Sequence, residues 1–249
     1  MRIPFKLVVG IMLIDAKVNG KAGHLVFDTG AVQTTLNTRY FNGEDGDIKA
    51  YTYDATEHEN MNTNTVQMIN SVIEFSSYKI ENNTVAIDMS YVENPLKEID
   101  KDVVFLGSLG FDFIKNHKVT IDYENKVIIL DEDFEKKGVQ IPLEMGIVPM
   151  MDVTINGNDY KFVFDTGASY CVFNTDFNDI FDIQPDEKGL FKAPLIKCGS
   201  VGILEATSQV ADLSAIKDNF GASGIIGYPL LKDYISNINF ENKMLTLVK

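Results

Sequence analysis

The chain has 249 residues, of which 45% are apolar, and its 36 acidic and 22 basic side chains give a net charge of −14. This composition excludes a disordered chain, and the negative charge argues against nucleic acid or an anionic membrane surface as the main partner. The length allows one or two domains with substantial cores.

Residues that commonly bind metals or form covalent links are few. His24, His58 and His117 are scattered and form no cluster with cysteine, so we expect no zinc site and no cofactor. Cys171 and Cys198 could pair in an oxidising compartment, but two separate buried thiols are the simpler expectation.

The chain opens with a basic and apolar stretch, MRIPFKLVVGIMLID, which has some features of a signal peptide. Its apolar part is short and lacks a small-residue cleavage site. The stretch also has a counterpart deep inside the chain, so we expect it to belong to the fold. No stretch is long enough to span a bilayer. Localisation is left open, and an extracytoplasmic compartment is favoured only if Met1 follows a trimmed leader.

The chain is an internal duplication. Both copies contain Ile-Pro, Asn-Gly and Asp-Thr-Gly-Ala runs in the same order. Because the repeat is too long for a solenoid, we predict two similar lobes, 1–140 and 141–249. The matching segments are 3–31 with 141–168, 85–90 with 210–214, and 107–130 with 224–247.

In chain order, each half is predicted to consist mainly of strands. Alternating apolar residues lead to Asn19-Gly20 and to Asn156-Gly157, each a two-residue hairpin signal, and an apolar strand then returns. A short helix is expected directly after Gly110 and Gly227. The closing stretches VTIDYENKVIIL and SNINFENKMLTL each predict a strand, a turn and a second strand. We therefore predict mostly-β lobes with one short helix in each.

The returning strands end at Asp28 and Asp165, each within an Asp-Thr-Gly-Ala run. A buried aspartate is costly unless it is stabilised; the glycine permits a tight turn and the threonine hydroxyl can tie two loops together. If the lobes pack about an approximate two-fold axis, the two carboxyl groups meet and share one proton. One carboxylate can then activate a water while the protonated one polarises a peptide carbonyl, with no metal and no acyl-enzyme.

These features resemble the retropepsin-like aspartic proteases, in the form of a single-chain, duplicated, bacterial-type member. The resemblance rests on FDTGA in each half and on a later apolar element ending in glycine, SLG at 108–110 and IIG at 225–227. It implies an all-β fold of two homologous β-barrel-like lobes related by a pseudo-two-fold axis. It also implies a monomeric aspartic endopeptidase that binds an extended polypeptide in the cleft between the lobes, beneath a hairpin flap, and uses no metal.

The family pattern assigns roles to particular residues. In the second lobe the tip of the flap is expected in PDEKGLFK at 185–192, whose composition suits a turn. The other assignments are Asp28 and Asp165 for catalysis; Thr29, Gly30, Thr166 and Gly167 for supporting the loops and lining the substrate; and Gly110 and Gly227 for packing beside the loops.

The two halves differ in length. From the catalytic aspartate to the later glycine there are 82 positions in the first half and 62 in the second, so the first carries about 20 extra residues, mostly in 42–66 and 91–102. This insertion is either an ordinary surface loop or an enlarged flap, to which Tyr51 or Tyr53 could contribute.

Two single residues also depart from the pattern. Ser108 stands where the family usually has an aliphatic residue, and we expect it to weaken the packing under the loop. Cys171 corresponds to Thr34 of the first half and has no nearby histidine pattern, so we do not expect it to act as a nucleophile.

Two alternative functions compete with the endopeptidase. A non-catalytic peptide- or protein-binding module could retain the fold, but both Asp-Thr-Gly triplets are intact. A glycoside hydrolase also uses two carboxylates, yet it explains neither the threonines and glycines nor the duplication. The leading prediction is an endopeptidase with apolar pockets flanking the cleaved bond, aided by backbone hydrogen bonds to an extended peptide.

Overall fold

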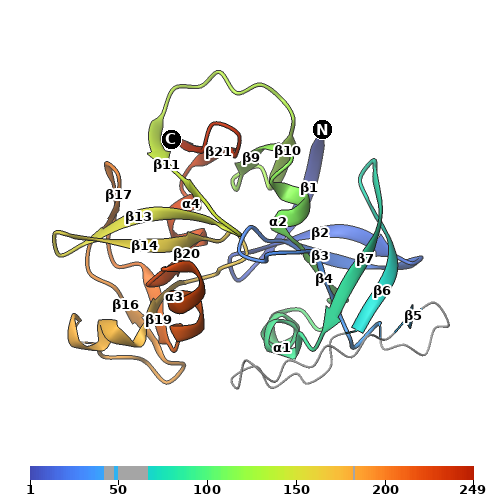
Figure 1. Ribbon diagram of the computed structural model, residues 1–249, viewed down its shortest axis with the longest axis horizontal. Coiled ribbons are helices and arrows are strands. Elements are labelled where there is room, and N and C mark those ends of the chain that lie inside the picture. Colours follow the sequence, from blue (N-terminus) through green and yellow to red (C-terminus); the bar gives the residue numbers. More distant parts are fainter. Residues whose placement is uncertain (42–47, 50–66, 182) are drawn as a thin grey trace.

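The computed structural model describes residues 1–41, 48–49, 67–181 and 183–249 (Figure 1). Among the residues that the structure describes, 49% are in strands and 14% in helices. The prediction of a mostly-β chain is therefore confirmed.

The first half begins with three strands that pair antiparallel in sequence order. They are β1 (Arg2–Val8), β2 (Ile11–Val18) and β3 (Lys21–Phe27). Asn19 and Gly20 have φ angles of 49° and 81°, the left-handed values that a two-residue type I′ hairpin turn requires. The predicted hairpin is confirmed.

Strands from later in the chain hold β3 in place. β8 (Phe105–Leu109) pairs with β3 in parallel, and β4 (Thr35–Asn37) lies on the other side of β8, antiparallel to it. β7 (Tyr78–Ile87) then runs parallel to β4. The segment between β3 and β4, which carries Asp28, is therefore fixed at both ends by one sheet. The sheet continues through β6 (Gln67–Phe75) and β5 (Ile48–Lys49).

The same set of pairings recurs in the second half. β13 (Pro149–Ile155) and β14 (Asn158–Phe164) form a hairpin, and β14 is parallel to β20 (Gly224–Ile226). β15 (Cys171–Asn174) lies antiparallel to β20 and parallel to β19 (Thr207–Ala211). Asp165 thus follows β14 in the same strand context in which Asp28 follows β3. The other strands are β12 (Glu144–Met145), β16 (Leu190–Lys192), β17 (Ile196–Cys198) and β18 (Val201–Ile203).

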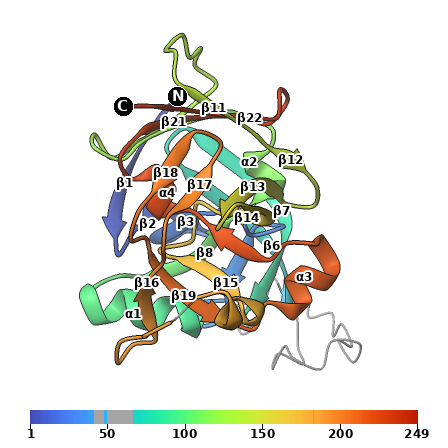
Figure 2. The ribbon, with the colours of Figure 1, turned by 90° about the vertical axis from the view of Figure 1, so that its left-hand side faces the viewer.

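A further row of strands joins the two halves. β9 (Lys118–Asp122) pairs antiparallel with β21 (Ile235–Asn239), flanked by β10 (Val127–Leu130) and β22 (Met244–Val248). β1 and β11 (Val139–Pro142) lie on the outside of this row. It closes the end of the molecule at which both chain ends lie (Figure 1, Figure 2).

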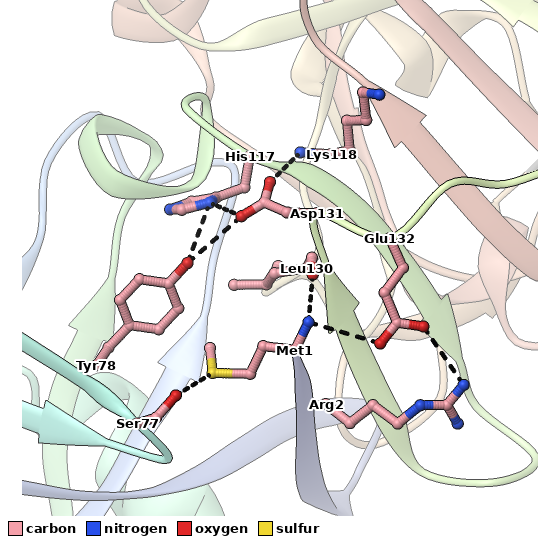
Figure 3. Close-up of polar contacts among 9 residues, drawn as sticks. All are labelled: Met1, Arg2, Ser77, Tyr78, His117, Lys118, Leu130, Asp131 and Glu132. Carbon is pink, nitrogen blue, oxygen red and sulfur yellow. Dashed lines mark hydrogen bonds and ion pairs between the residues drawn. The ribbon is translucent and has the colours of Figure 1, made fainter.

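Polar contacts mark the point where the chain leaves the first half (Figure 3). Asp131, directly after β10, lies 2.7 Å from Nδ1 of His117 and accepts a hydrogen bond of 3.2 Å from the backbone N–H of Lys118. Arg2 and Glu132 form an ion pair of 3.5 Å. Because most of these groups are exposed, the contacts contribute little to stability, but they fix where the connecting segment 131–138 starts.

The described part of the chain contains four α-helices. α2 (Phe111–Ile114) and α4 (Tyr228–Leu231) follow Gly110 and Gly227 directly, as predicted. α1 (Ser90–Ile99) and α3 (Ser214–Phe220) are additional, so the prediction of one short helix per lobe is wrong. Pro95 lies inside α1 among mostly polar residues, a pattern that is more typical of a loop. A 3₁₀ helix, η1 (Thr175–Asp179), follows β15.

The main hydrophobic core runs through both halves, and two smaller clusters lie under α1 and α3. Aromatic contacts link the halves: the ring after each late glycine packs edge-on against a ring of the other half. Phe111 lies 5.2 Å from Phe240, and Tyr228 lies 5.3 Å from Tyr123. Within the described ranges, no helix has the length and apolar character needed to cross a membrane.

Candidate active site

The loops that follow β3 and β14 meet, and the carboxyl groups of Asp28 and Asp165 are in hydrogen-bonding contact. The neighbouring glycines make this approach possible. A Cβ on Gly30 would lie 2.4 Å from Cγ of Asp165, and one on Gly167 would lie 2.8 Å from Cγ of Asp28. Each loop therefore needs glycine where it faces the carboxyl group of the other loop.

Each loop also directs backbone N–H groups at its own aspartate. Oδ1 of Asp28 accepts hydrogen bonds of 2.9 Å from both Gly30 and Ala31. Oδ1 of Asp165 accepts one of 2.7 Å from Gly167. The two carboxyl groups are thus held in fixed orientations by the backbone that carries them.

Thr29 and Thr166 interlock the two loops by reciprocal hydrogen bonds. The N–H of each threonine donates to Oγ1 of the other, at 3.1 and 3.0 Å. Each hydroxyl then donates across the interface, from Thr29 to the carbonyl of Phe164 and from Thr166 to that of Phe27, both at 2.8 Å. Both threonines are completely buried, so these four bonds are shielded from water.

Gly110 and Gly227 lie against the backbone of the same loops. A Cβ on Gly110 would lie 2.3 Å from the carbonyl carbon of Gln33, and one on Gly227 would lie 1.9 Å from the carbonyl oxygen of Asp165. Neither position has room for a side chain. Both glycines lie where the sequence pattern places them, beside the loops.

Burial raises the pKa of both aspartates above the ordinary value of 3.8. For Asp28, hydrogen bonds from Asp165, from the N–H groups of Ala31 and Gly30, and from the Ser108 hydroxyl oppose this rise. The pKa of Asp165 is raised well above 3.8, because the negative charge of Asp28 adds to the effect of burial. Because two carboxylates this close repel each other, we expect the pair to share one proton.

The contact between Ser108 and Asp28 was not foreseen from the sequence. Ser108 is buried in β8 and its hydroxyl hydrogen-bonds the Asp28 carboxyl group. The matching position of the second half is Ile225 in β20, which has no polar side-chain atom. Because β8 runs parallel to β3, with Ser108 opposite Val26, its hydroxyl reaches the carboxyl group at the end of β3. The available signal was a polar residue on a buried strand next to the strand that ends at Asp28.

A cavity of about 320 Å³ lies directly beside Asp28. Residues of α1 and of the chain from Gly167 to β15 line it. The walls are mostly apolar and include Val26, Tyr91, Val92, Leu96, Ala168 and Val172.

The expected flap regions are described only in part. Residues 186–190 form an exposed turn in which Asp186 N–H donates to the Leu190 carbonyl at 2.7 Å. The assignment of 185–192 as a flap tip stays a prediction. Tyr51 and Tyr53 lie outside the described residues.

Cys171 and Cys198 are both free and buried, so the prediction of separate thiols is confirmed. Burial raises the pKa of each thiol to about 12, which keeps both protonated near neutral pH and argues against a nucleophilic role. No group of three or more His, Cys, Asp or Glu side chains in the described part of the chain is placed to hold a metal ion.

Neither a scan against protein-family models nor a search of the curated proteins gives a match.

Proposed function

We propose that the protein is an aspartic endopeptidase of the retropepsin-like type, which hydrolyses peptide bonds with Asp28 and Asp165. The observation that carries this proposal is the pair of partly buried, facing carboxyl groups on two loops of identical Asp-Thr-Gly-Ala sequence. In this proposal the halves are homologous lobes related by a pseudo-two-fold axis, with the substrate cleft between them. The recurring strand pairings and the reciprocal threonine bonds support that relation.

The proposed reaction begins with Asp28 ionised and Asp165 protonated. A water molecule held between them gives a proton to Asp28 as its oxygen bonds to the carbonyl carbon of the peptide. Asp165 gives its proton to the carbonyl oxygen, so that a neutral tetrahedral diol forms. The C–N bond then breaks: Asp28 passes its proton to the leaving nitrogen and one diol hydroxyl returns a proton to Asp165. The pair ends in its starting state.

The environments of the two aspartates favour this division of roles. Asp28 has more hydrogen-bond donors directed at it, and these stabilise a carboxylate. Burial and the charge of Asp28 raise the pKa of Asp165 well above 3.8, which suits Asp165 to hold and donate the proton. No covalent intermediate and no metal are needed.

The cavity beside Asp28 is proposed to bind the side chain next to the cleaved bond. Its walls offer mainly apolar surface, so burial of a large apolar side chain favours binding by about 25 cal/mol per Å² of surface removed from water. We therefore propose an unfolded or extended polypeptide as the substrate, cleaved next to a large apolar residue.

The test is cleavage of an unfolded protein substrate over a range of about pH 3 to 7, where one shared proton is expected. Wild-type protein should cleave it, while Asp28→Asn and Asp165→Asn should each lower kcat/KM by about a thousandfold or more, because the first variant lacks the proton acceptor and the second lacks the proton donor. Asp133→Asn is the matched control, since the Asp133 side chain is 89% exposed and lies in the connecting segment.

Equal activity of wild-type protein and both active-site variants would contradict the proposal. If none of the proteins cleaves but wild type binds the unfolded substrate in the cleft, the non-catalytic peptide-binding module is the correct interpretation. Thermal unfolding of each variant shows whether the fold is retained.

A further inference from the structure

Two helices that the sequence did not predict, α1 and α3, lie on the side of the molecule away from the β9–β21 row (Figure 1, Figure 2). α1 supplies Tyr91, Val92 and Leu96 to the cavity beside Asp28. The width of that cavity therefore depends on where α1 sits. The contacts that hold α1 determine which side chains the cavity accepts.

Glu93 of α1 is not among the residues that line the cavity, and it is buried, with only 1% of it exposed. Its Oε1 accepts hydrogen bonds of 2.7 Å from the Tyr40 hydroxyl and 2.6 Å from Nζ of Lys97, and lies 3.6 Å from Nε of Arg39. Its Oε2 accepts one of 3.0 Å from Nδ2 of Asn37. Burial by itself raises the pKa of Glu93, but the bonds from Lys97, Tyr40 and Asn37 outweigh it and lower the pKa, so the carboxylate is ionised.

Asn37 connects this carboxylate to the strands that carry the catalytic loop. It ends β4, nine positions after Asp28. Besides its bond to Glu93, its Nδ2 donates to the carbonyl of Phe105 in β8 at 3.1 Å, and its Oδ1 accepts from the N–H of Arg39 at 3.1 Å. One side chain thus ties α1, β4 and β8 together.

The second half uses the same position in a similar way. Asn174 ends β15, nine positions after Asp165. Its Oδ1 accepts a hydrogen bond of 2.9 Å from the N–H of Leu213, the residue that precedes α3. Asn174 is 3% exposed and Asn37 is 1% exposed. In both halves, a buried asparagine at this position holds the helix that comes later in the chain.

We propose that Asn37 and Glu93 are positioning residues that fix α1 against the catalytic lobe and so set the preference for large side chains in the cavity beside Asp28. This inference rests on the proposed function of the site. Apolar packing alone is non-directional and lets a helix shift along its contact. A buried carboxylate with four polar partners has one geometry that satisfies it, since any shift leaves charged or polar atoms unpaired.

The experiment compares three peptides that differ only in the residue before the cleaved bond, which is Ala, Leu or Phe. In Glu93→Ala and in Asn37→Ala, the ratio of kcat/KM for Phe over Ala should fall by about tenfold, mainly through a higher KM for the Phe peptide. Glu93→Gln keeps the Oε1 acceptor for Tyr40 and Lys97 but places an N–H donor where Oε2 accepts from Asn37, so it should recover only part of the lost Phe/Ala ratio. The pH profile should not change in any variant, because the two aspartates are untouched.

The double variant Asn37→Ala/Glu93→Ala tests the coupling directly. If the two residues hold α1 through the same interaction, the Phe/Ala ratio of kcat/KM should fall little further in the double variant than in either single variant. Glu98→Ala is the matched control, since Glu98 lies on the same helix but is exposed. A Phe/Ala ratio within twofold of wild type in folded Glu93→Ala and Asn37→Ala, or an equal loss of kcat/KM for all three peptides, would overturn the inference. If Glu93→Ala does not fold, the Phe/Ala ratios of Asn37→Ala and Glu93→Gln test the inference instead.

Failure of the proposed function has a separate signature. Binding of the same three peptides, with the scissile amide replaced by a reduced, uncleavable bond, is measured by fluorescence anisotropy. If wild-type protein cleaves nothing but prefers the Phe analogue, and Glu93→Ala abolishes that preference, the positioning role holds and only the catalytic proposal fails. If wild-type protein cleaves the peptides but Glu93→Ala leaves the preference for Phe unchanged, the catalytic proposal holds and the positioning role of Glu93 fails.

Discussion

Asp28 and Asp165 have identical sequence neighbours in the Asp-Thr-Gly-Ala run, yet their surroundings in the fold differ. The difference comes from strands distant in the sequence: β8 brings a hydroxyl to Asp28, whereas β20 brings only Ile225 to the equivalent place. The sequence predicted both aspartates and both threonines because duplication made them visible. It could identify Ser108 as unusual but not what the residue faces, since that depends on the parallel pairing of β8 with β3.

In Ser108→Ala, the acid limb of the pH–activity profile is expected to move to higher pH, so that the proposed activity covers a narrower pH range. The hydroxyl opposes the rise in the pKa of Asp28, so without it Asp28 becomes protonated, and activity falls, at a higher pH than in wild type. The plateau value of kcat should change by less than about tenfold, because the serine takes no proton. Tyr91 and Tyr123, whose pKa values are raised, stay neutral in this range and do not contribute.

The measurement is the pH dependence of kcat/KM for wild type, Ser108→Ala and Ser108→Ile, the last of which copies the second half. Ser236→Ala is the control, because Ser236 is equally buried in a strand and its hydroxyl has no hydrogen-bond partner in the described structure. An acid limb that stays in place in both Ser108 variants would contradict the role given to the hydroxyl.

Among the secondary-structure elements, those with short-range signals were predicted and those with long-range causes were not. The two Asn-Gly hairpins and the helices after Gly110 and Gly227 follow from local turn chemistry. α1 could not be predicted in this way, because Pro95 interrupts its helical pattern and its polar residues are typical of an exposed loop. Glu93 has the character of a surface residue in the sequence, but in the fold Asn37 and Tyr40 enclose it.

Gly110→Ala and Gly227→Ala are expected to destabilise the protein strongly, because α2 and α4 bring these positions against loop backbone that cannot move aside. The contacts at 2.3 and 1.9 Å force a backbone shift, with an expected loss of about 3 kcal/mol or more in the free energy of unfolding, and lost activity in any protein that still folds. Urea denaturation measures the loss.

Gly20→Ala provides the comparison for this effect. No heavy atom lies within 4 Å of the place that the alanine Cβ would take at Gly20, so only its φ of 81° opposes the substitution, at a cost of about 1 kcal/mol. A loss at Gly110 or Gly227 no larger than that at Gly20 would show that the loops yield easily and would contradict the packing role.

For the molecule as a whole, the partly buried pair of aspartates makes stability depend on pH. The pKa of Asp165 is raised well above 3.8 in the folded protein, so the folded state holds a proton that the unfolded chain releases. This contribution is complete at pH values below about 3.8 and is lost as the pH rises through the folded-state pKa. The wild-type protein is therefore expected to lose stability at higher pH from this site.

Asp165→Asn removes the titrating group and should gain stability relative to wild type as the pH rises. The difference in Tm between the two proteins should be small near pH 3 and should grow in favour of the variant toward pH 8, by a few degrees for each ~1 kcal/mol. Differential scanning calorimetry at several pH values measures it, with Asp133→Asn as the exposed control. A Tm difference that is constant with pH would mean that the carboxyl group is not buried as described.

The largely exposed segment 131–138 is the covalent bridge between the two halves. A short tether raises the effective concentration of one half near the other to roughly the millimolar range. It also fixes a one-to-one ratio of the halves, so that each first half pairs with a second half and not with another first half. Two identical subunits could not give one carboxyl group a serine and the other an isoleucine, so a single tethered chain is what allows the two acids to specialise.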